Sequence, residues 1–205
     1  MHLKYEIKMV KRVPIVMIDG VPHLFDTGHP AVAAAVSPGV AAFLGVPNLR
    51  LLGYGWLKRY ARIDYANRIL ETSDEPIVMA DGKTVALYCG AGSRPRVDMM
   101  VRGVSLRPYV DTGAAYSYVY GLGRDFPAFG VVEENDLSGK HWTVSAYRIP
   151  CRFDDHPFEV IGADAGDCPS PVPPENVIGY DFFNSFTVVI DKVGGVLAYE
   201  NAKNT

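Results

Sequence analysis

Short apolar runs that end at glycine turns occur in the same order in the two halves of the chain. Residues 14–20 (PIVMIDG) and 97–103 (VDMMVRG) are each typical of a strand that ends at such a turn. A second strand is predicted after each run, and it ends in the same tripeptide: Asp26-Thr27-Gly28 in the first half and Asp111-Thr112-Gly113 in the second. The pattern predicts two copies of one strand–turn–strand unit.

The segments downstream of these tripeptides also repeat. Residues 46–57 (VPNLRLLGYGWL) and 172–183 (VPPENVIGYDFF) both open with Val-Pro and place Gly-Tyr at the same distance from it. Each predicts a short helix, then a strand ending in Ile-Asp, a turn and a further short strand. We therefore expect an all-β chain with short helices, divided into a first lobe over 1–75, a connecting hairpin over 76–83 and a second lobe over 84–205.

The two copies differ in length. Asp26 lies 27 residues before Gly53, whereas Asp111 lies 68 residues before Gly179, so the second copy holds about 41 additional residues. Within them, residues 136–140 (DLSGK) are a strong turn signal, followed by a strand-like run over 141–153 with an interruption at Pro150. We expect a hairpin over 132–149 with its tip near 137–141, in the second copy only. A separate hairpin is expected over 77–87, around Asp-Gly at 81–82.

Composition and charge narrow the function classes. The chain is 48% hydrophobic and 21% charged, which is enough to build a core, and its net charge is −3 without a basic stripe, which argues against a nucleic-acid partner. No apolar stretch approaches the ~18 residues of a membrane span, and the N-terminus is not typical of a signal peptide. The three cysteines, Cys89, Cys151 and Cys168, lack the spacing of a zinc site or disulfide framework, so we expect reduced thiols in a cytoplasmic protein.

An Asp-Thr-Gly at a strand end, followed by two apolar residues, a glycine and a short helix, resembles the retropepsin and pepsin aspartic peptidases. The resemblance covers nearly the whole chain and is closer in the second copy, where Asp111-Thr112-Gly113-Ala114 has the retropepsin form. In the first copy His29-Pro30 replaces the usual Ser, Thr or Ala. The resemblance implies duplicated retropepsin-like acid-protease β-barrel lobes with pseudo-two-fold symmetry on a single chain, so that dimerisation is not required for the active site.

The resemblance also assigns roles to individual residues. Asp26 and Asp111 would be the catalytic residues, and the 132–149 hairpin would be the flap that closes over the substrate. The residues expected to support the active site are Thr27, Gly28, Thr112, Gly113 and Ala114. The residues expected to contact substrate at the flap are Ser138, Gly139, Lys140, His141 and Trp142.

The chemistry fits these residue types. Two carboxylates about 3 Å apart cannot both ionise, so they share one proton: the ionised one activates water and the neutral one hydrogen-bonds the substrate carbonyl. We expect an aspartic endopeptidase that acts on a peptide or protein substrate without a metal or cofactor. Because Ala114 has no side-chain donor for its neighbouring carboxylate, we expect an activity optimum nearer neutral than that of acid pepsins.

Other interpretations stay open at this point. The same fold is compatible with a catalytically inactive peptide-binding module, and Asp26 and Asp111 also suit simple turns. His29 suits a loop residue better than a catalytic one. Trp142 and Tyr147 fit either the substrate cleft or the base of the flap. The Pro-rich segment 168–174 predicts a stiff loop.

Overall fold

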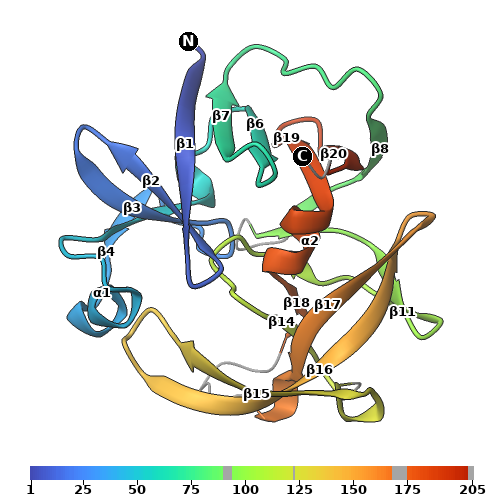
Figure 1. Ribbon diagram of the computed structural model, residues 1–205. Helices are drawn as coiled ribbons and strands as arrows, with labels where there is room; N and C mark the ends of the chain where they lie inside the picture. The colour runs from blue at the N-terminus through green and yellow to red at the C-terminus, as the bar shows by residue number, and fades with distance from the viewer. Residues whose placement is uncertain (90–93, 122, 168–174, 203–205) are drawn as a thin grey trace.

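The computed structural model describes residues 1–89, 94–121, 123–167 and 175–202, and strands dominate it (Figure 1). The strands form two ten-stranded sheets. The described residues contain two α-helices, α1 (Pro38–Leu44) and α2 (Tyr180–Ser185), and three short 3-10 helices over Tyr54–Trp56, Gly123–Asp125 and Ala165–Asp167. The prediction of an all-β chain with short helices is confirmed at this level.

The first sheet begins as an antiparallel meander of three strands. Tight turns join them at residues 11–12 and 19–20, where Lys11, Arg12 and Asp19 all have positive φ. The strands of this sheet are β1 (Leu3–Val10), β2 (Val13–Ile18), β3 (Val21–Asp26), β4 (Ala33–Ala35), β5 (Arg50–Gly53), β6 (Tyr60–Asp64), β7 (Ile69–Ser73), β8 (Lys83–Ala86), β19 (Phe186–Asp191) and β20 (Val196–Asn201). β5 returns parallel to β3 and pairs Gly53 with Asp26. This pairing holds the end of β3 against the glycine.

The second sheet repeats this parallel pairing. Its strands are β9 (Tyr88–Cys89), β10 (Pro95–Arg96), β11 (Met99–Val101), β12 (Val104–Leu106), β13 (Tyr109–Val110), β14 (Ser117–Val119), β15 (Ala128–Asn135), β16 (His141–Phe153), β17 (His156–Asp164) and β18 (Val177–Ile178). β18 runs parallel to β13 and pairs Ile178 with Val110, and the backbone N–H of Asp111 donates to the carbonyl of Ile178 at 2.9 Å. Asp111 thus lies directly after the end of β13, in a position that corresponds to that of Asp26 at the end of β3.

Strands from both ends of the chain meet in the first sheet. β19 pairs antiparallel with β6, so that Ile190 lies opposite Ala61 and Val188 opposite Ile63. β20 continues the sheet beyond β19, and β8 adds at its edge. The two predicted halves are therefore joined by continuous backbone pairing.

The hairpin expected over 77–87 does not form. Residues 77–82 contain no strand, and only β8 is extended, paired with β20 rather than with its own preceding segment. An isolated two-stranded hairpin is only marginally stable in water. The first arm of the expected hairpin does not pack on the rest of the protein, since Val78 is 82% exposed, and so it gains no stability from burial. The second arm instead gains a ladder partner at the edge of an existing sheet.

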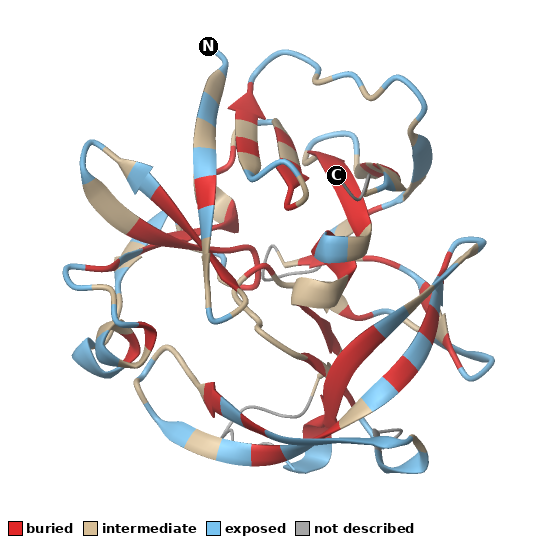
Figure 2. Cartoon of the chain, in the orientation of Figure 1, coloured by how far each residue is buried: buried red, intermediate tan, exposed pale blue. Residues whose placement is uncertain are grey.

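Aromatic rings fill the centre of the core, which Figure 2 shows as buried segments where the elements of the two sheets converge. Phe153 of β16 packs edge-on against Phe182 of α2, with ring centroids 5.0 Å apart, and against Phe186 of β19 at 5.5 Å. Tyr199 of β20 completes this cluster. Because these rings come from the second sheet, from α2 and from the last hairpin, they fix the two sheets against each other.

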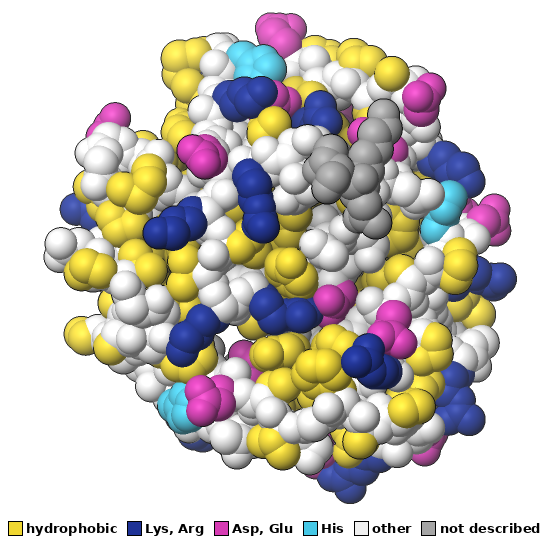
Figure 3. Space-filling view, in the orientation of Figure 1, with side chains coloured by type: hydrophobic (Ala, Val, Ile, Leu, Met, Phe, Trp, Pro, Cys, Tyr) yellow, Lys and Arg dark blue, Asp and Glu magenta, His cyan; other side chains and the backbone are white. Residues whose placement is uncertain are grey.

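No helix among the described residues is long and apolar enough to cross a membrane. Cys89 and Cys151 are free thiols, and the same described residues contain no cluster of His, Cys, Asp or Glu that could hold a metal ion. Cys168 and the rest of the Pro-rich segment 168–174 lie outside the described residues. On the face in Figure 3, Lys and Arg side chains are scattered with Asp and Glu among them.

Candidate active site

The two Asp-Thr-Gly loops are tied together through their threonines, both of which are fully buried. The backbone N–H of Thr27 donates to Oγ1 of Thr112 at 3.0 Å, and the N–H of Thr112 donates to Oγ1 of Thr27 at the same distance. Each hydroxyl in turn donates to a carbonyl of the opposite loop, Thr27 to Val110 and Thr112 to Phe25, both at 2.7 Å. These four reciprocal bonds hold the loops face to face.

The glycines of the loops make room for the opposite aspartate. A Cβ atom on Gly28 would lie 2.2 Å from Oδ2 of Asp111, and one on Gly113 would lie 2.6 Å from Cγ of Asp26. Real Cβ atoms do not approach other atoms so closely, so any side chain here would displace the carboxyl groups. Glycine is therefore required by contact between the loops as well as by the turn itself.

A second pair of glycines packs beneath the loops in the same way on each side. A Cβ on Gly53 would lie 2.4 Å from the carbonyl oxygen of His29, and one on Gly179 would lie 2.4 Å from that of Ala114. The next residue donates its N–H to the same carbonyl: Tyr54 to His29 at 2.7 Å, and Tyr180 to Ala114 at 3.0 Å. The matched Gly-Tyr pairs of the sequence thus occupy matched positions under the two aspartates.

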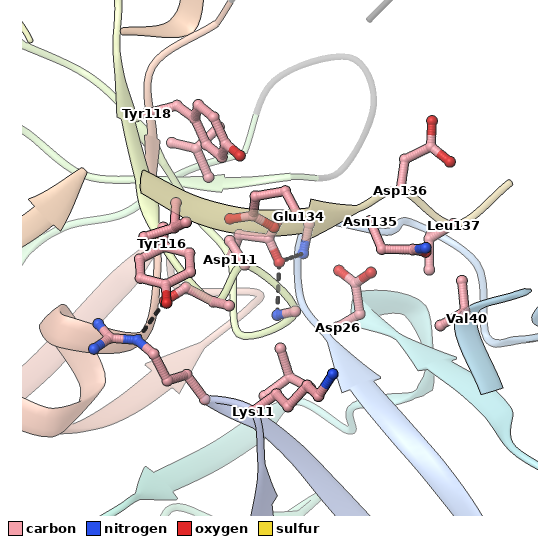
Figure 4. Close-up of a pocket in the computed structure, with 18 of the residues that line it drawn as sticks. Lys11, Asp26, Val40, Asp111, Tyr116, Tyr118, Glu134, Asn135, Asp136 and Leu137 are labelled. Carbon is pink, nitrogen blue, oxygen red and sulfur yellow. Dashed lines mark hydrogen bonds between the residues drawn. The ribbon is translucent and has the colours of Figure 1, made fainter. Parts of the chain in front are cut away.

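The carboxyl groups of Asp26 and Asp111 lie close enough that each shifts the pKa of the other. Asp26 is 6% exposed, and its Oδ1 has no hydrogen-bond partner among the described residues. Oδ1 of Asp111 accepts hydrogen bonds from the backbone N–H groups of Gly113 at 2.8 Å and Gly28 at 3.3 Å (Figure 4). The surroundings of the two carboxyl groups are therefore unequal.

This inequality determines which carboxyl keeps the proton. Burial raises the pKa of Asp26 well above its usual value, and the neighbouring charge of Asp111 raises it further, while the backbone N–H groups of His29 and Gly28 work against that rise. Burial raises the pKa of Asp111 as well, but the hydrogen bonds from Asp26, Gly113 and Gly28 work against that rise. Asp26 is thus the better proton holder, and Asp111 is the better ionised partner.

The pair opens into a cavity of about 1070 Å³. Its walls come from the β1–β2 turn, from α1, from the loop after Asp111 and from the hairpin of β15 and β16. The apolar side chains of the α1 wall are Val13, Leu24, Val40, Phe43 and Leu44, and the polar side chains around the cavity include Arg12, Arg94, Tyr116, Tyr118 and Glu134. A cavity of this size at the upper end of the usual range suits an extended ligand rather than a single small molecule.

The β15–β16 hairpin forms the side of the cavity opposite the aspartates. Its strands pair from Ala128 with Tyr147 to Asn135 with His141, and Oδ1 of Asp136 closes the turn by accepting from the N–H groups of Ser138 and Lys140. The hairpin lies where the sequence predicted it, except that its first arm begins at Ala128 rather than at 132 and its pairing ends at Tyr147 rather than at 149.

The expected interruption at Pro150 is absent, because β16 runs through it. β15 pairs only as far as Tyr147 and β11 begins pairing at Cys151, so Pro150 lies in the gap between these two neighbours. The N–H of Arg148 points to that side, where it donates to Pro127, and a residue two positions on faces the same way. No ladder hydrogen bond is therefore lost at the proline.

The tip of the hairpin reaches across to α1 in the other half of the chain (Figure 1). Leu137 packs against the apolar cluster that includes Val40 and Leu44, and the ring of His141 lies 5.6 Å from that of Phe43. The tip and α1 also meet through their backbones, since a Cβ on Gly39 would lie 3.2 Å from Cα of Gly139. The hairpin is therefore closed over the aspartates.

The predicted flap residues separate into two groups. Ser138 and Trp142 line the cavity. Gly139 and His141 face α1, and Lys140 is exposed on the turn. Trp142 lines the cavity and also packs against the apolar cluster of the hairpin strands around Val132 and Val144, whereas Tyr147 packs on the main core.

His29 is turned back on its own loop. Its Nδ1 accepts a hydrogen bond from the N–H of Ala31 at 3.2 Å, as a loop residue would. The sequence did not predict the polar residues around the cavity, which include Arg12, Arg94, Tyr116, Tyr118 and Glu134. The strand alternation of β15 contained the signal for one of them, since Glu134 falls on the same face as Val132, two residues earlier.

The candidate site is thus a cavity over two neighbouring aspartates, built from matched segments of the two halves. No protein-family model matches the chain, and no curated protein matches it significantly.

Proposed function

We propose that this protein is an aspartic endopeptidase of the retropepsin and pepsin type, with both lobes, over 1–75 and 84–205, on one chain. The observation that carries the proposal is the reciprocal bonding of Thr27 and Thr112, which holds the carboxyl groups of Asp26 and Asp111 beside each other at the floor of a large cavity. When two neighbouring carboxyl groups differ in pKa, one can act as the base for the attacking water and the other as the acid for the carbonyl oxygen of the same peptide bond.

The reaction follows from the unequal surroundings of the pair. A water molecule attacks the carbonyl carbon of the peptide, Asp111 accepts a proton from the water, and Asp26 donates its proton to the carbonyl oxygen. The resulting diol then collapses: the carbon–nitrogen bond breaks, the nitrogen takes the proton from Asp111, and one hydroxyl of the diol returns a proton to Asp26. The pair ends in the protonation state in which it began.

The hairpin and the cavity support an extended peptide as the substrate. Within the described chain β15 pairs only with β16, so its outer edge offers backbone groups to which a peptide can add as a strand. The apolar wall around Val40 and Phe43 suits a hydrophobic substrate side chain. Closure of the hairpin on α1 would shield a bound peptide from bulk water, and substrate entry requires the tip to lift.

The test is cleavage of a diverse peptide mixture between about pH 3 and pH 8 by the wild type, Asp26→Asn and Asp111→Asn, with products identified by mass spectrometry. We expect cleavage by the wild type and a loss of about 10²–10⁴-fold in each variant. Asp125→Asn, an exposed aspartate on the surface, is the matched control and retains activity. If the wild type binds peptides but cleaves none in this range, the catalytically inactive binding module replaces the enzyme.

A further inference from the structure

Glu134 is a third carboxyl group in the cavity, and the proposed reaction does not use it. It lies on β15, is 9% exposed, and lines the cavity together with Asp26 and Asp111 (Figure 4). Its neighbour across the hairpin is Trp142, which lies on the same face. Glu134 therefore projects from the flap toward the space that a substrate would fill.

The carboxyl group of Glu134 is only partly satisfied. It accepts hydrogen bonds from the hydroxyl of Tyr118 and the backbone N–H of Asn135. Its Oε1 is buried and has no hydrogen-bond partner in the part of the chain that the structure describes. Oδ1 of the adjacent Asn135, which also lines the cavity, is a second buried acceptor without a partner in the same described residues.

The cations that line the cavity with Glu134 have other partners, although the charge of Arg12 still lowers the pKa of Glu134. Arg94 pairs with Glu175 at 3.0 Å. Arg12 forms an ion pair with Asp181 at 2.7 Å and stacks on the ring of Tyr180. Lys11 lies over the ring of Phe43 at 3.9 Å. Among the described residues no ion pair involves Glu134. A buried carboxylate without a counter-ion is unfavourable unless a ligand supplies the missing charge and donors.

We infer that Glu134 is a specificity-determining residue that binds the positively charged side chain of a lysine or arginine in the peptide substrate. The inference rests on the proposed function, since it names the substrate class of the same cavity. An ammonium or guanidinium group brings several N–H donors, which match the free Oε1 of Glu134 and the free Oδ1 of Asn135. Because both charged groups leave water when they pair, the site favours a basic side chain strongly over an uncharged side chain of similar length, which would leave the carboxylate unpaired.

The experiment compares peptides that differ at a single position. A peptide cleaved by the wild type is prepared with lysine, arginine, norleucine or glutamate at each position flanking the scissile bond, and kcat/KM is measured for the wild type, Glu134→Gln and Glu6→Gln. Glu6 is the control because it carries the same charge, is exposed on β1 and does not line the cavity.

At one position we expect the wild type to prefer lysine or arginine over norleucine by about tenfold or more. Glu134→Gln loses that preference while cleaving the norleucine peptide within about threefold of the wild-type rate, and Glu6→Gln keeps the preference. Equal rates for basic and neutral peptides in the wild type, or an unchanged preference in Glu134→Gln, would overturn the inference while leaving the endopeptidase intact.

Failure of the proposed function is a separate outcome. If the wild type cleaves none of these peptides, the same peptides carrying a fluorophore are tested for binding by anisotropy. Tighter binding of the lysine than of the norleucine peptide, lost in Glu134→Gln, supports the recognition role without catalysis. Equal binding by both proteins contradicts it.

Discussion

The backbone nitrogen of Thr27 lies 3.0 Å from Oγ1 of Thr112, and the backbone nitrogen of Thr112 lies 3.0 Å from Oγ1 of Thr27. Each threonine is thus both donor and acceptor for the opposite loop, and neither is exposed to water. The two aspartates next to them owe their mutual position to this exchange. The threonines are therefore structural residues whose loss is expected to reduce stability first and catalysis as a consequence.

Thr112→Ala is expected to lower the free energy of unfolding by about 2–4 kcal/mol, because it leaves the N–H of Thr27 and the carbonyl of Phe25 buried without partners. Thr112→Ser keeps the hydroxyl and retains most of that stability. Urea unfolding followed by circular dichroism measures both, with Thr84→Ala on the exposed face of β8 as the control. Equal stability of Thr112→Ala and Thr84→Ala would contradict the role of the exchange.

Asp26→Asn is expected to be more stable than the wild type at high pH, and its advantage is expected to grow as pH rises. The raised pKa of Asp26 means that the folded state holds a proton which the unfolded state releases near pH 4, so the stabilisation present below about pH 4 is lost as pH rises through the folded-state pKa. Asparagine does not titrate and still offers Asp111 an N–H donor. At pH 8 the variant is expected to exceed the wild type by about 1 kcal/mol or more.

Unfolding free energies of the wild type, Asp26→Asn and the surface control Asp125→Asn, measured at pH 4 and pH 8, test this prediction. The gap between Asp26→Asn and the wild type grows with pH, and the gap for the control does not. Parallel pH dependence of Asp26→Asn and the wild type would mean that the buried pair does not hold an extra proton.

Leu137→Asp is expected to open the flap. Burying a leucine side chain contributes about 1.5–3 kcal/mol, and Leu137 is the residue that packs the hairpin tip into the apolar cluster beside α1. The variant should raise KM for a peptide by about tenfold and increase amide hydrogen exchange in β15. Val193→Asp, at a 74% exposed turn position, is the control. Unchanged exchange in β15 would show that the tip contact does not hold the flap closed.

The preference for a basic substrate residue is expected to weaken as pH falls from 8 to 6. Burial raises the pKa of Glu134 to about 7; the charge of Asp111 raises it as well, while Tyr118, the N–H of Asn135 and Arg12 lower it. Below that pH the carboxyl is neutral and cannot pair with lysine. The lysine-to-norleucine ratio of kcat/KM falls by at most about tenfold per pH unit, and dividing the two rates cancels the titration of the aspartate pair. A ratio independent of pH would contradict an ionising Glu134.

Most of the contacts that position the two aspartates could be predicted from the sequence. The duplicated Asp-Thr-Gly and Gly-Tyr segments placed Asp26 against Gly53 and Asp111 beside Ile178, because local turn chemistry and parallel strand pairing determine both contacts. The flap was predictable for the same reason, since residues 136–140 form a self-contained turn closed by the Asp136 side chain.

What the sequence did not contain depends on contacts between distant segments. The Asp-Gly at 81–82 suggested a hairpin, but β8 found a partner in β20, more than a hundred residues later. The alternation of β15 places Glu134 on the same face as Val132, but the burial of Glu134 arises only when β15 folds over the cavity and faces Tyr118 and Arg12. Pairing across the chain and the environment of a side chain are tertiary properties that local patterns do not encode.

The most direct test of the central claim is a carbon-13 NMR titration of the aspartate carboxyl groups, with the signals of Asp26 and Asp111 assigned from the two asparagine variants. We predict that at about pH 5 one proton is shared by the pair, with the Asp26 carbon shifted toward the protonated form and the Asp111 carbon toward the ionised form. Asp26→Asn should also change the titration of Asp111. Independent titration of both groups near their ordinary value of about 3.9 would contradict the shared-proton mechanism and with it the proposed endopeptidase.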